Sequence, residues 1–144
     1  MKKMFIIAGL FVIFGYIQQA KAADIHKELK KYFNDIAVKV KNTSNTERKR
    51  EILNDSFKKM MTALDEVEHT PLSENDIQSL KSFKKQLKLK YNELNGIDGF
   101  EKVSNNNLNN FADYSVQDLE PSAEYVTISV LTLVLIIIAA ALLL

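Results

Sequence analysis

The 144-residue sequence contains no cysteine, which excludes disulfide bonds, thiolate metal sites, cysteine catalysis and a lipid-modified N-terminal cysteine. Glycine occurs only four times and histidine only twice. With so little glycine the chain has no phosphate-binding glycine-rich loop, and neither His26 nor His69 lies in a hydrolase or metalloprotease motif. We therefore expect a protein that is not an enzyme and that carries no cofactor.

A large excess of charge of one sign is also missing. The chain has 19 basic and 18 acidic residues, which argues against a nucleic-acid partner, because nucleic-acid-binding proteins present strongly basic surfaces. The charges are unevenly distributed, since no basic residue follows Lys102 whereas Asp113, Asp118, Glu120 and Glu124 do. We interpret residues 103–122, which are polar, acidic and rich in asparagine, as a membrane-proximal stalk or a short helix ending at Pro121.

The first 22 residues have the pattern of a cleavable secretory signal. Two lysines precede an apolar stretch from Met4 to Ile17, and Ala20 and Ala22 are the small residues that signal peptidase requires before its cut. The sequence predicts a signal peptide over 1–22 and a mature chain that begins at Ala23. An uncleaved signal anchor is the alternative.

The C-terminal residues 126–144 contain no charge, no proline and no glycine. As a helix they would extend about 28 Å, close to the roughly 30 Å hydrocarbon core of a bilayer. We predict a single transmembrane helix over 123–144 that contacts membrane lipid through residues 126–144. With a signal peptide at the other end, the domain between them is expected outside the cytoplasm, in the periplasm or at the cell surface of a bacterium.

Two alternatives remain for the C-terminal tail. In a eukaryotic microbe such a tail is exchanged for a glycolipid, which would make the protein a glycolipid-anchored surface antigen. The spacing of small residues before the tail, at Ser115, Ser122 and Ala123, fits that exchange poorly. Alternatively, the tail itself oligomerises or perturbs the bilayer, with the preceding helices controlling its assembly.

Between these ends, apolar residues recur at intervals of three and four, which is typical of amphipathic helices. The pattern predicts helices over 24–41, 45–68 and 74–94. Ser44 with Glu47 and Ser73 with Asp76 have the spacing of helix N-terminal capping pairs, and Asn95-Gly96 is expected to end the third helix.

Three helices joined by short loops predict an all-α fold, an antiparallel three-helix bundle over residues 23–102. The stalk and the transmembrane helix would follow it. A three-helix core is small, so the alternative is a coiled-coil-like module that forms a homo-oligomer and completes its core with another copy.

Two charged clusters are candidates for binding. Asp65, Glu66, Glu68 and His69 offer ligands to a divalent cation, but their spacing is unspecific and we expect solvated charges and no metal. The lysines Lys81, Lys84, Lys85 and Lys88 form a basic ridge along the third helix, which would contact an anionic membrane surface or a partner if it is more than a solvated face. Met60 and Met61 are expected in the core. The sequence thus predicts a membrane-tethered helical module that mediates interactions with a protein or a surface that the residues do not identify.

Overall fold

The computed structural model describes residues 22–124, 126, 134 and 138, with side chains from residue 26 onward. These residues form four α-helices, one short 3-10 helix and no strand. The elements are α2 (Ala22–Lys41), α3 (Thr46–Glu68), α4 (Glu74–Asn95), η1 (Asn105–Asn107) and α5 (Leu108–Glu124). The all-α prediction is confirmed for the described part of the chain, and the three expected helices are present with nearly the expected bounds.

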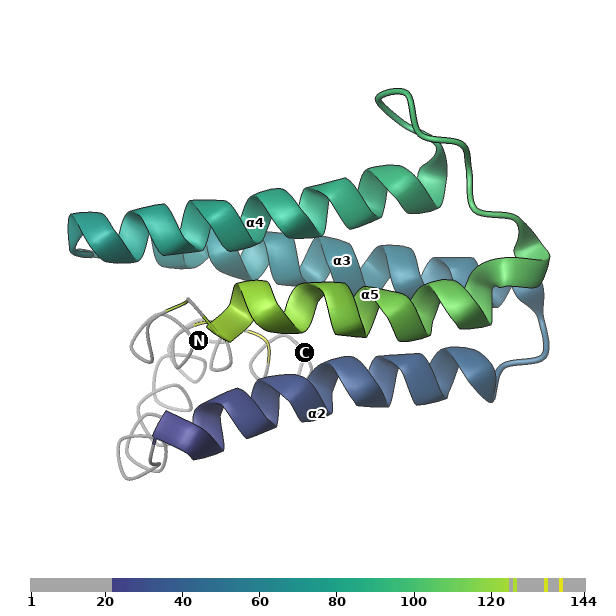
Figure 1. Ribbon diagram of the computed structural model, residues 1–144, viewed down its shortest axis with the longest axis horizontal. Coiled ribbons are helices and arrows are strands. Elements are labelled where there is room, and N and C mark those ends of the chain that lie inside the picture. Colours follow the sequence, from purple (N-terminus) through teal and green to yellow (C-terminus); the bar gives the residue numbers. More distant parts are fainter. Residues whose placement is uncertain (1–21, 125, 127–133, 135–137, 139–144) are drawn as a thin grey trace, which may run out of the picture.

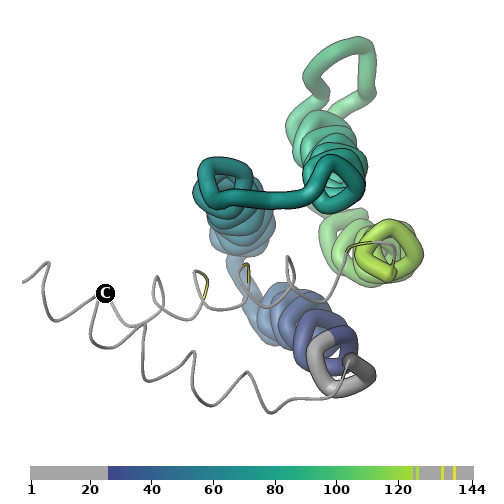
Figure 2. Tube along the Cα trace, turned by 90° about the vertical axis from the view of Figure 1, so that its left-hand side faces the viewer, coloured from purple at the N-terminus to yellow at the C-terminus, as the bar shows by residue number. Residues whose placement is uncertain are grey.

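The helices run alternately up and down, so that each one is antiparallel to its neighbour in sequence (Figure 1). Each also packs against that neighbour, and α5 closes the ring by packing against α2. Seen along its axis, the bundle has its four helices arranged around a common centre (Figure 2). The start of α2 and the end of α5 therefore lie at one end of the bundle, and η1 lies at the other.

Helix ends follow the sequence signals with one exception. The Ser73 hydroxyl accepts a hydrogen bond from the Asp76 N–H at 3.2 Å, as predicted. At the start of α3 the predicted cap, Ser44, is wrong by one residue. Asn45 caps this helix instead, because its side-chain oxygen is three residues before the Arg48 N–H and accepts from it at 2.9 Å.

The core is built from the apolar stripes of all four helices. Two edge-to-face aromatic pairs reach across its centre: Phe33 of α2 meets Phe83 of α4 at 6.4 Å, and Phe57 of α3 meets Phe111 of α5 at 6.2 Å between ring centroids. Met60 is almost fully buried, as expected. Since each pair joins diagonally opposite helices, the core depends on all four.

Over 103–122 the stalk is wrong from Leu108 onward and the alternative of a short helix holds there, but this helix continues past Pro121 to Glu124 and is the fourth helix of the bundle. Leu108, Phe111, Ala112 and Leu119 of α5 are buried. The fourth side of the core is thus supplied by the same chain. Three of the four acidic residues that follow Lys102 in helix α5 are paired with lysines of other helices. The ion pairs are Lys41–Asp113 at 2.6 Å, Lys30–Glu120 at 2.7 Å and Lys90–Asp118 at 2.5 Å.

The predictions for the two ends lie almost entirely outside the described residues. Ala20 is not among them, and Ala22 is the first residue of α2. Of residues 126–144 the structure describes Val126, Val134 and Ile138, all three of which are buried. Among the described residues, no helix has the length and apolar character needed to cross a bilayer.

Candidate functional site

The loop of residues 96–104, which joins α4 to η1, is the feature of the bundle most suited to contact a partner. It projects from the end of the bundle opposite to the start of α2 and the end of α5 (Figure 1). Ile97 and Phe100 are on this loop, and their side chains are 40% and 39% exposed. Binding residues are often carried by loops that a rigid scaffold positions, which makes these two side chains candidates for contact with a partner.

The first half of the loop is fixed by the way α4 ends. Gly96 has φ 66°, and the Ile97 N–H donates to the Asn92 carbonyl at 2.9 Å, which closes the last turn of the helix. The Asn92 side chain, itself buried, donates to the Asp98 carboxylate at 2.9 Å. This bond holds Asp98 in a left-handed conformation at φ 55°, which an aspartate tolerates better than most residues.

The second half of the loop is held by Arg50 of α3. One guanidinium nitrogen donates to the Leu94 carbonyl at 2.7 Å, and another donates to the Val103 carbonyl at 2.5 Å and to the Asn105 side chain at 3.1 Å. A single side chain therefore joins the end of α4, the end of the loop and the start of η1. Burial lowers the pKa of Arg50, but a guanidinium stays charged at neutral pH.

The loop also passes directly over Gly96. A Cβ atom built at this position would lie 2.9 Å from the backbone nitrogen of Lys102, whereas one built at Gly99, with φ 86°, meets nothing within 4 Å. Glycine at position 96 thus allows the segment of the loop around Lys102 to approach the end of α4 closely. The outcome is a folded loop with little freedom at either base.

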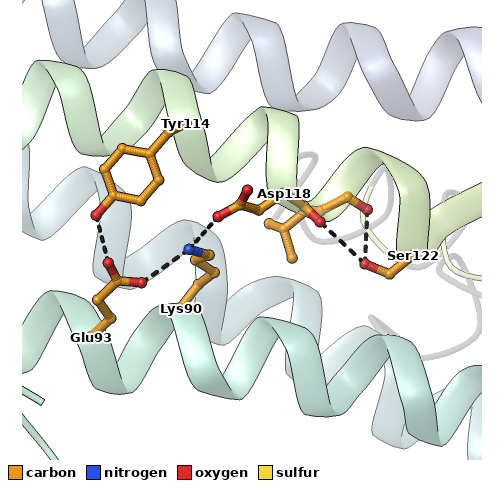
Figure 3. Close-up of polar contacts among 6 residues, drawn as sticks. Lys90, Glu93, Tyr114, Asp118 and Ser122 are labelled. Atoms are coloured by element: carbon orange, nitrogen blue, oxygen red, sulfur yellow. Dashed lines mark hydrogen bonds and ion pairs between the residues drawn. The ribbon is translucent and has the colours of Figure 1, made fainter.

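A polar network joins α4 and α5 (Figure 3). The Lys90 ammonium lies between the carboxylates of Glu93, at 3.0 Å, and Asp118, at 2.5 Å, and the Tyr114 hydroxyl donates to Glu93 at 2.6 Å. Lys90 also lies 4.8 Å from the centre of the Tyr114 ring. The Ser122 hydroxyl extends the chain of contacts to the Asp118 carbonyl at 3.4 Å.

The pKa values in this network favour the forms that hold α4 to α5. Burial lowers the pKa of Lys90, but hydrogen bonds with Asp118 and Glu93 outweigh it, so the pKa is raised. Burial, together with the hydrogen bond to Glu93, raises the pKa of Tyr114. At neutral pH the lysine is charged and the tyrosine is not, whereas a catalytic base or nucleophile needs a lowered pKa in these residue types. The network therefore has the properties of a structural contact that stabilises the packing of α4 against α5.

The basic ridge of α4 is smaller than its sequence pattern indicates. Lys81, Lys85 and Lys88 are exposed, but the ammonium of Lys84 pairs with Asp65 and lies 3.8 Å from Glu68, both on α3. The hydrogen bond with Asp65 is the largest cause of the raised pKa of Lys84. The acidic cluster and the ridge therefore partly neutralise each other across the α3–α4 interface.

The cation ligands suggested by the sequence are not gathered into a site. Asp65 and Glu68 face Lys84, while Glu66 and His69 are exposed. No group of three histidine or acidic residues that could hold a metal ion occurs among the described residues.

The centre of the bundle contains one small cavity of about 30 Å³. Its walls are apolar except for Ser56 and Ser115. The Ser56 hydroxyl donates to the Ile52 carbonyl at 2.7 Å, whereas the buried Ser115 hydroxyl has no hydrogen-bond partner within the described part of the chain. A volume of this size is enough for about one water molecule and is well below the roughly 150 Å³ that holds benzene in an engineered core.

Sequence reasoning singled out Gly96 but missed the other residues that form the candidate site. Ile97 and Phe100 carried a signal, because each directly follows a glycine in a chain that has only four. Arg50 carried none, since its carbonyl partners are 44 and 53 residues away in sequence.

Comparison with protein-family models, with curated proteins and with solved structures found no match to this chain. The function must therefore be inferred from the geometry of the bundle itself.

Proposed function

We propose that this protein is a non-enzymatic helical module, tethered to a membrane outside the cytoplasm by residues 126–144, that binds a partner protein through the loop 96–104. The observation that carries the proposal is the exposure of Ile97 and Phe100 on a loop that Arg50 and Asn92 hold in place. Because the loop is already ordered, binding requires little additional loss of conformational freedom.

The position of the loop supports a role in recognition. It lies at the end of the bundle farthest from the start of α2 and the end of α5 (Figure 1). A tether that follows α5 would therefore leave the loop directed away from its own membrane. Helix α3 has 23 residues, so the loop would stand about 35 Å from that surface.

A protein partner suits the loop better than a lipid surface does. The exposed charges beside Ile97 and Phe100 are those of Asp98, Glu101 and Lys102, a net negative set that an anionic headgroup layer would repel. Burying the exposed part of each apolar side chain contributes on the order of 1 kcal/mol. Two such side chains support a weak contact, so we expect either transient binding or several copies acting together.

Site-specific photo-crosslinking tests the recognition role. A photoreactive amino acid replaces Phe100, or, as the matched control, Val38, which is 52% exposed on the outer face of α2. With the full chain produced in its own host cell, we expect a discrete adduct from position 100 that is absent from position 38. Adding Ile97→Ser should abolish the adduct, and the purified partner should then bind the wild-type chain and not the Ile97→Ser variant. Identical adducts from positions 100 and 38 would contradict the proposal.

The tether is tested separately by fractionation. We expect the full chain to sediment with membranes, to begin at Ala23, and to be digested by protease added outside the cell. Deleting residues 126–144 should release it. Release by a phospholipase specific for glycolipid anchors would instead support the surface-antigen alternative. Loss of oligomers when an unrelated apolar helix replaces the tail would support tail-driven assembly.

A further inference from the structure

A second and larger cavity, of about 180 Å³, opens between α2 and α5 at the end of the bundle where α2 begins and α5 ends. Its base is apolar and is formed by Leu29, Phe33 and Ala123, all of which are buried. Its volume exceeds the roughly 150 Å³ that accommodates benzene in an engineered protein core. The cavity is therefore large enough for a small polar group together with a few carbon atoms.

The rim of this cavity carries charges of both signs, each from a different helix. Lys30 of α2 pairs with Glu120 of α5 at 2.7 Å across the rim. Lys27 of α2 and Glu124 of α5 also line the cavity, and neither makes an ion pair with any residue that the structure describes. Among the described residues, Lys27 and Glu124 thus stand at the rim without a direct ion pair, although the charge of Glu124 contributes to the raised pKa of Lys30. His26 completes the lining on the α2 side.

The position of Glu124 in the sequence indicates where the rim would lie relative to a membrane. It is the last residue of α5 and is two residues before the apolar segment 126–144. If that segment crosses a bilayer, residues this close to its start lie at the level of the lipid headgroups. A ligand at the rim would then be the headgroup of a neighbouring lipid rather than a solute far from the membrane.

We propose that this cavity binds the headgroup of an ethanolamine-type zwitterionic phospholipid, with its phosphate at Lys27 and its ammonium at Glu124. The inference rests on the proposed membrane tether. An anionic headgroup would be repelled by Glu120 and Glu124, and a purely cationic ligand by Lys27 and Lys30, whereas a zwitterion places one charge of each sign beside Lys27 and Glu124.

The same chemistry separates ethanolamine from choline headgroups. A primary ammonium has three N–H donors that a glutamate can accept, whereas a quaternary ammonium has none and is usually held by exposed aromatic faces. The aromatic residue of the cavity, Phe33, is only 6% exposed and belongs to its base. The cavity therefore favours the ethanolamine headgroup.

The test titrates the full chain in detergent micelles with short-chain phosphatidylethanolamine, followed by the amide NMR shifts of Lys27 and Ala123. We expect saturable shifts, at least tenfold weaker binding of the matching phosphatidylcholine, and at least tenfold weaker binding of phosphatidylethanolamine by the Lys27→Gln/Glu124→Gln variant. That variant keeps the net charge. The control Lys39→Gln/Glu66→Gln makes the same exchange at exposed positions away from the cavity and should bind like wild type.

Equal binding of the two lipids, or unchanged binding by the Lys27→Gln/Glu124→Gln variant, would overturn the proposal. Soluble phosphoethanolamine that binds as tightly as the lipid would overturn the assignment to a membrane lipid. Membrane fractionation of the same variants distinguishes failure of the proposed headgroup site from failure of the proposed membrane tether. The Lys27→Gln/Glu124→Gln variant should still sediment with membranes, because residues 126–144 are unchanged.

Discussion

Replacing Arg50 by alanine should loosen the loop 96–104 and destabilise the whole bundle. The substitution removes hydrogen bonds to the Leu94 and Val103 carbonyls and to the Asn105 side chain. Each hydrogen bond that involves a charged group contributes about 1.5–3 kcal/mol in a buried setting. Arg50 is only partly buried and its three bonds share one guanidinium, so we expect a total loss of about 2 kcal/mol from the free energy of unfolding.

Arg48 provides the matched control for this prediction. It is two residues away on the same helix and pairs with Glu51, with both side chains more than half exposed. Exposed pairs of this kind contribute little, so Arg48→Ala should change the free energy of unfolding by less than about 0.5 kcal/mol. The loss of free energy of unfolding in Arg50→Lys should fall between those of the two alanine variants, because one ammonium cannot replace a planar guanidinium that donates to two carbonyls.

Urea unfolding of the full chain in detergent micelles, followed by circular dichroism, measures the global effect. Amide hydrogen exchange at Ile97 and Phe100 measures the local one, and we expect faster exchange there in Arg50→Ala than in Arg48→Ala. If the two alanine variants unfold alike within about 0.5 kcal/mol and the exchange of the loop is unchanged, Arg50 does not hold the loop.

Three further predictions concern individual groups in the bundle. Ser115→Ala should raise the free energy of unfolding by about 1 kcal/mol in urea titrations, because it removes a buried hydroxyl without a partner among the described residues. A loss of stability would instead show that this hydroxyl forms a hydrogen bond in solution. Gly96→Ala should destabilise the protein more than Gly99→Ala in the same assay. Both positions have positive φ, but only at Gly96 does the new Cβ meet the backbone. Equal losses of stability would contradict the close approach of Lys102 to Gly96. Raised pKa values of Lys90 and Tyr114, above their ordinary 10.5 and 10.0, mean that their protonated forms stabilise the folded state. This stability is present at neutral pH and should be lost as the pH rises above about 10, and the loss should be smaller in the Lys90→Gln/Tyr114→Phe variant.

The sequence was sufficient for α2, α3 and α4 because their signals are local. Apolar residues such as Leu80, Phe83 and Leu87 recur at helical spacing, and Ser73 and Gly96 mark the two ends of α4. The error at the start of α3 is also local. Ser44 and Asn45 are both good capping residues, and only the backbone conformation decides which of them accepts the hydrogen bond from the next turn.

The sequence predicts a stalk or a short helix over 103–122, and not a fourth helix of the bundle, because the residues that stabilise α5 are distant in sequence. Its acidic residues have no basic neighbour along the chain, a pattern typical of an extended solvated segment. In the fold they meet Lys30, Lys41 and Lys90, which belong to two other helices. Ser115 also interrupts the apolar stripe of α5 at a buried position. No window of local sequence contains these pairings, so periodicity alone could not show that this helix packs into the bundle.

The presence of α5 in the bundle changes what the proposed tether implies. A stalk of twenty residues would have let the domain move freely above a membrane. With α5 packed on α2 and ending at Glu124, only Tyr125 separates the bundle from the apolar segment that begins at Val126. Under the proposed tether, the end of α5 that packs on α2 would therefore lie next to the membrane. Under the proposed tether, the headgroup cavity would therefore lie against the membrane and the loop with Ile97 and Phe100 would face away from it, so that one rigid body would bring lipid contact and partner recognition to its opposite ends.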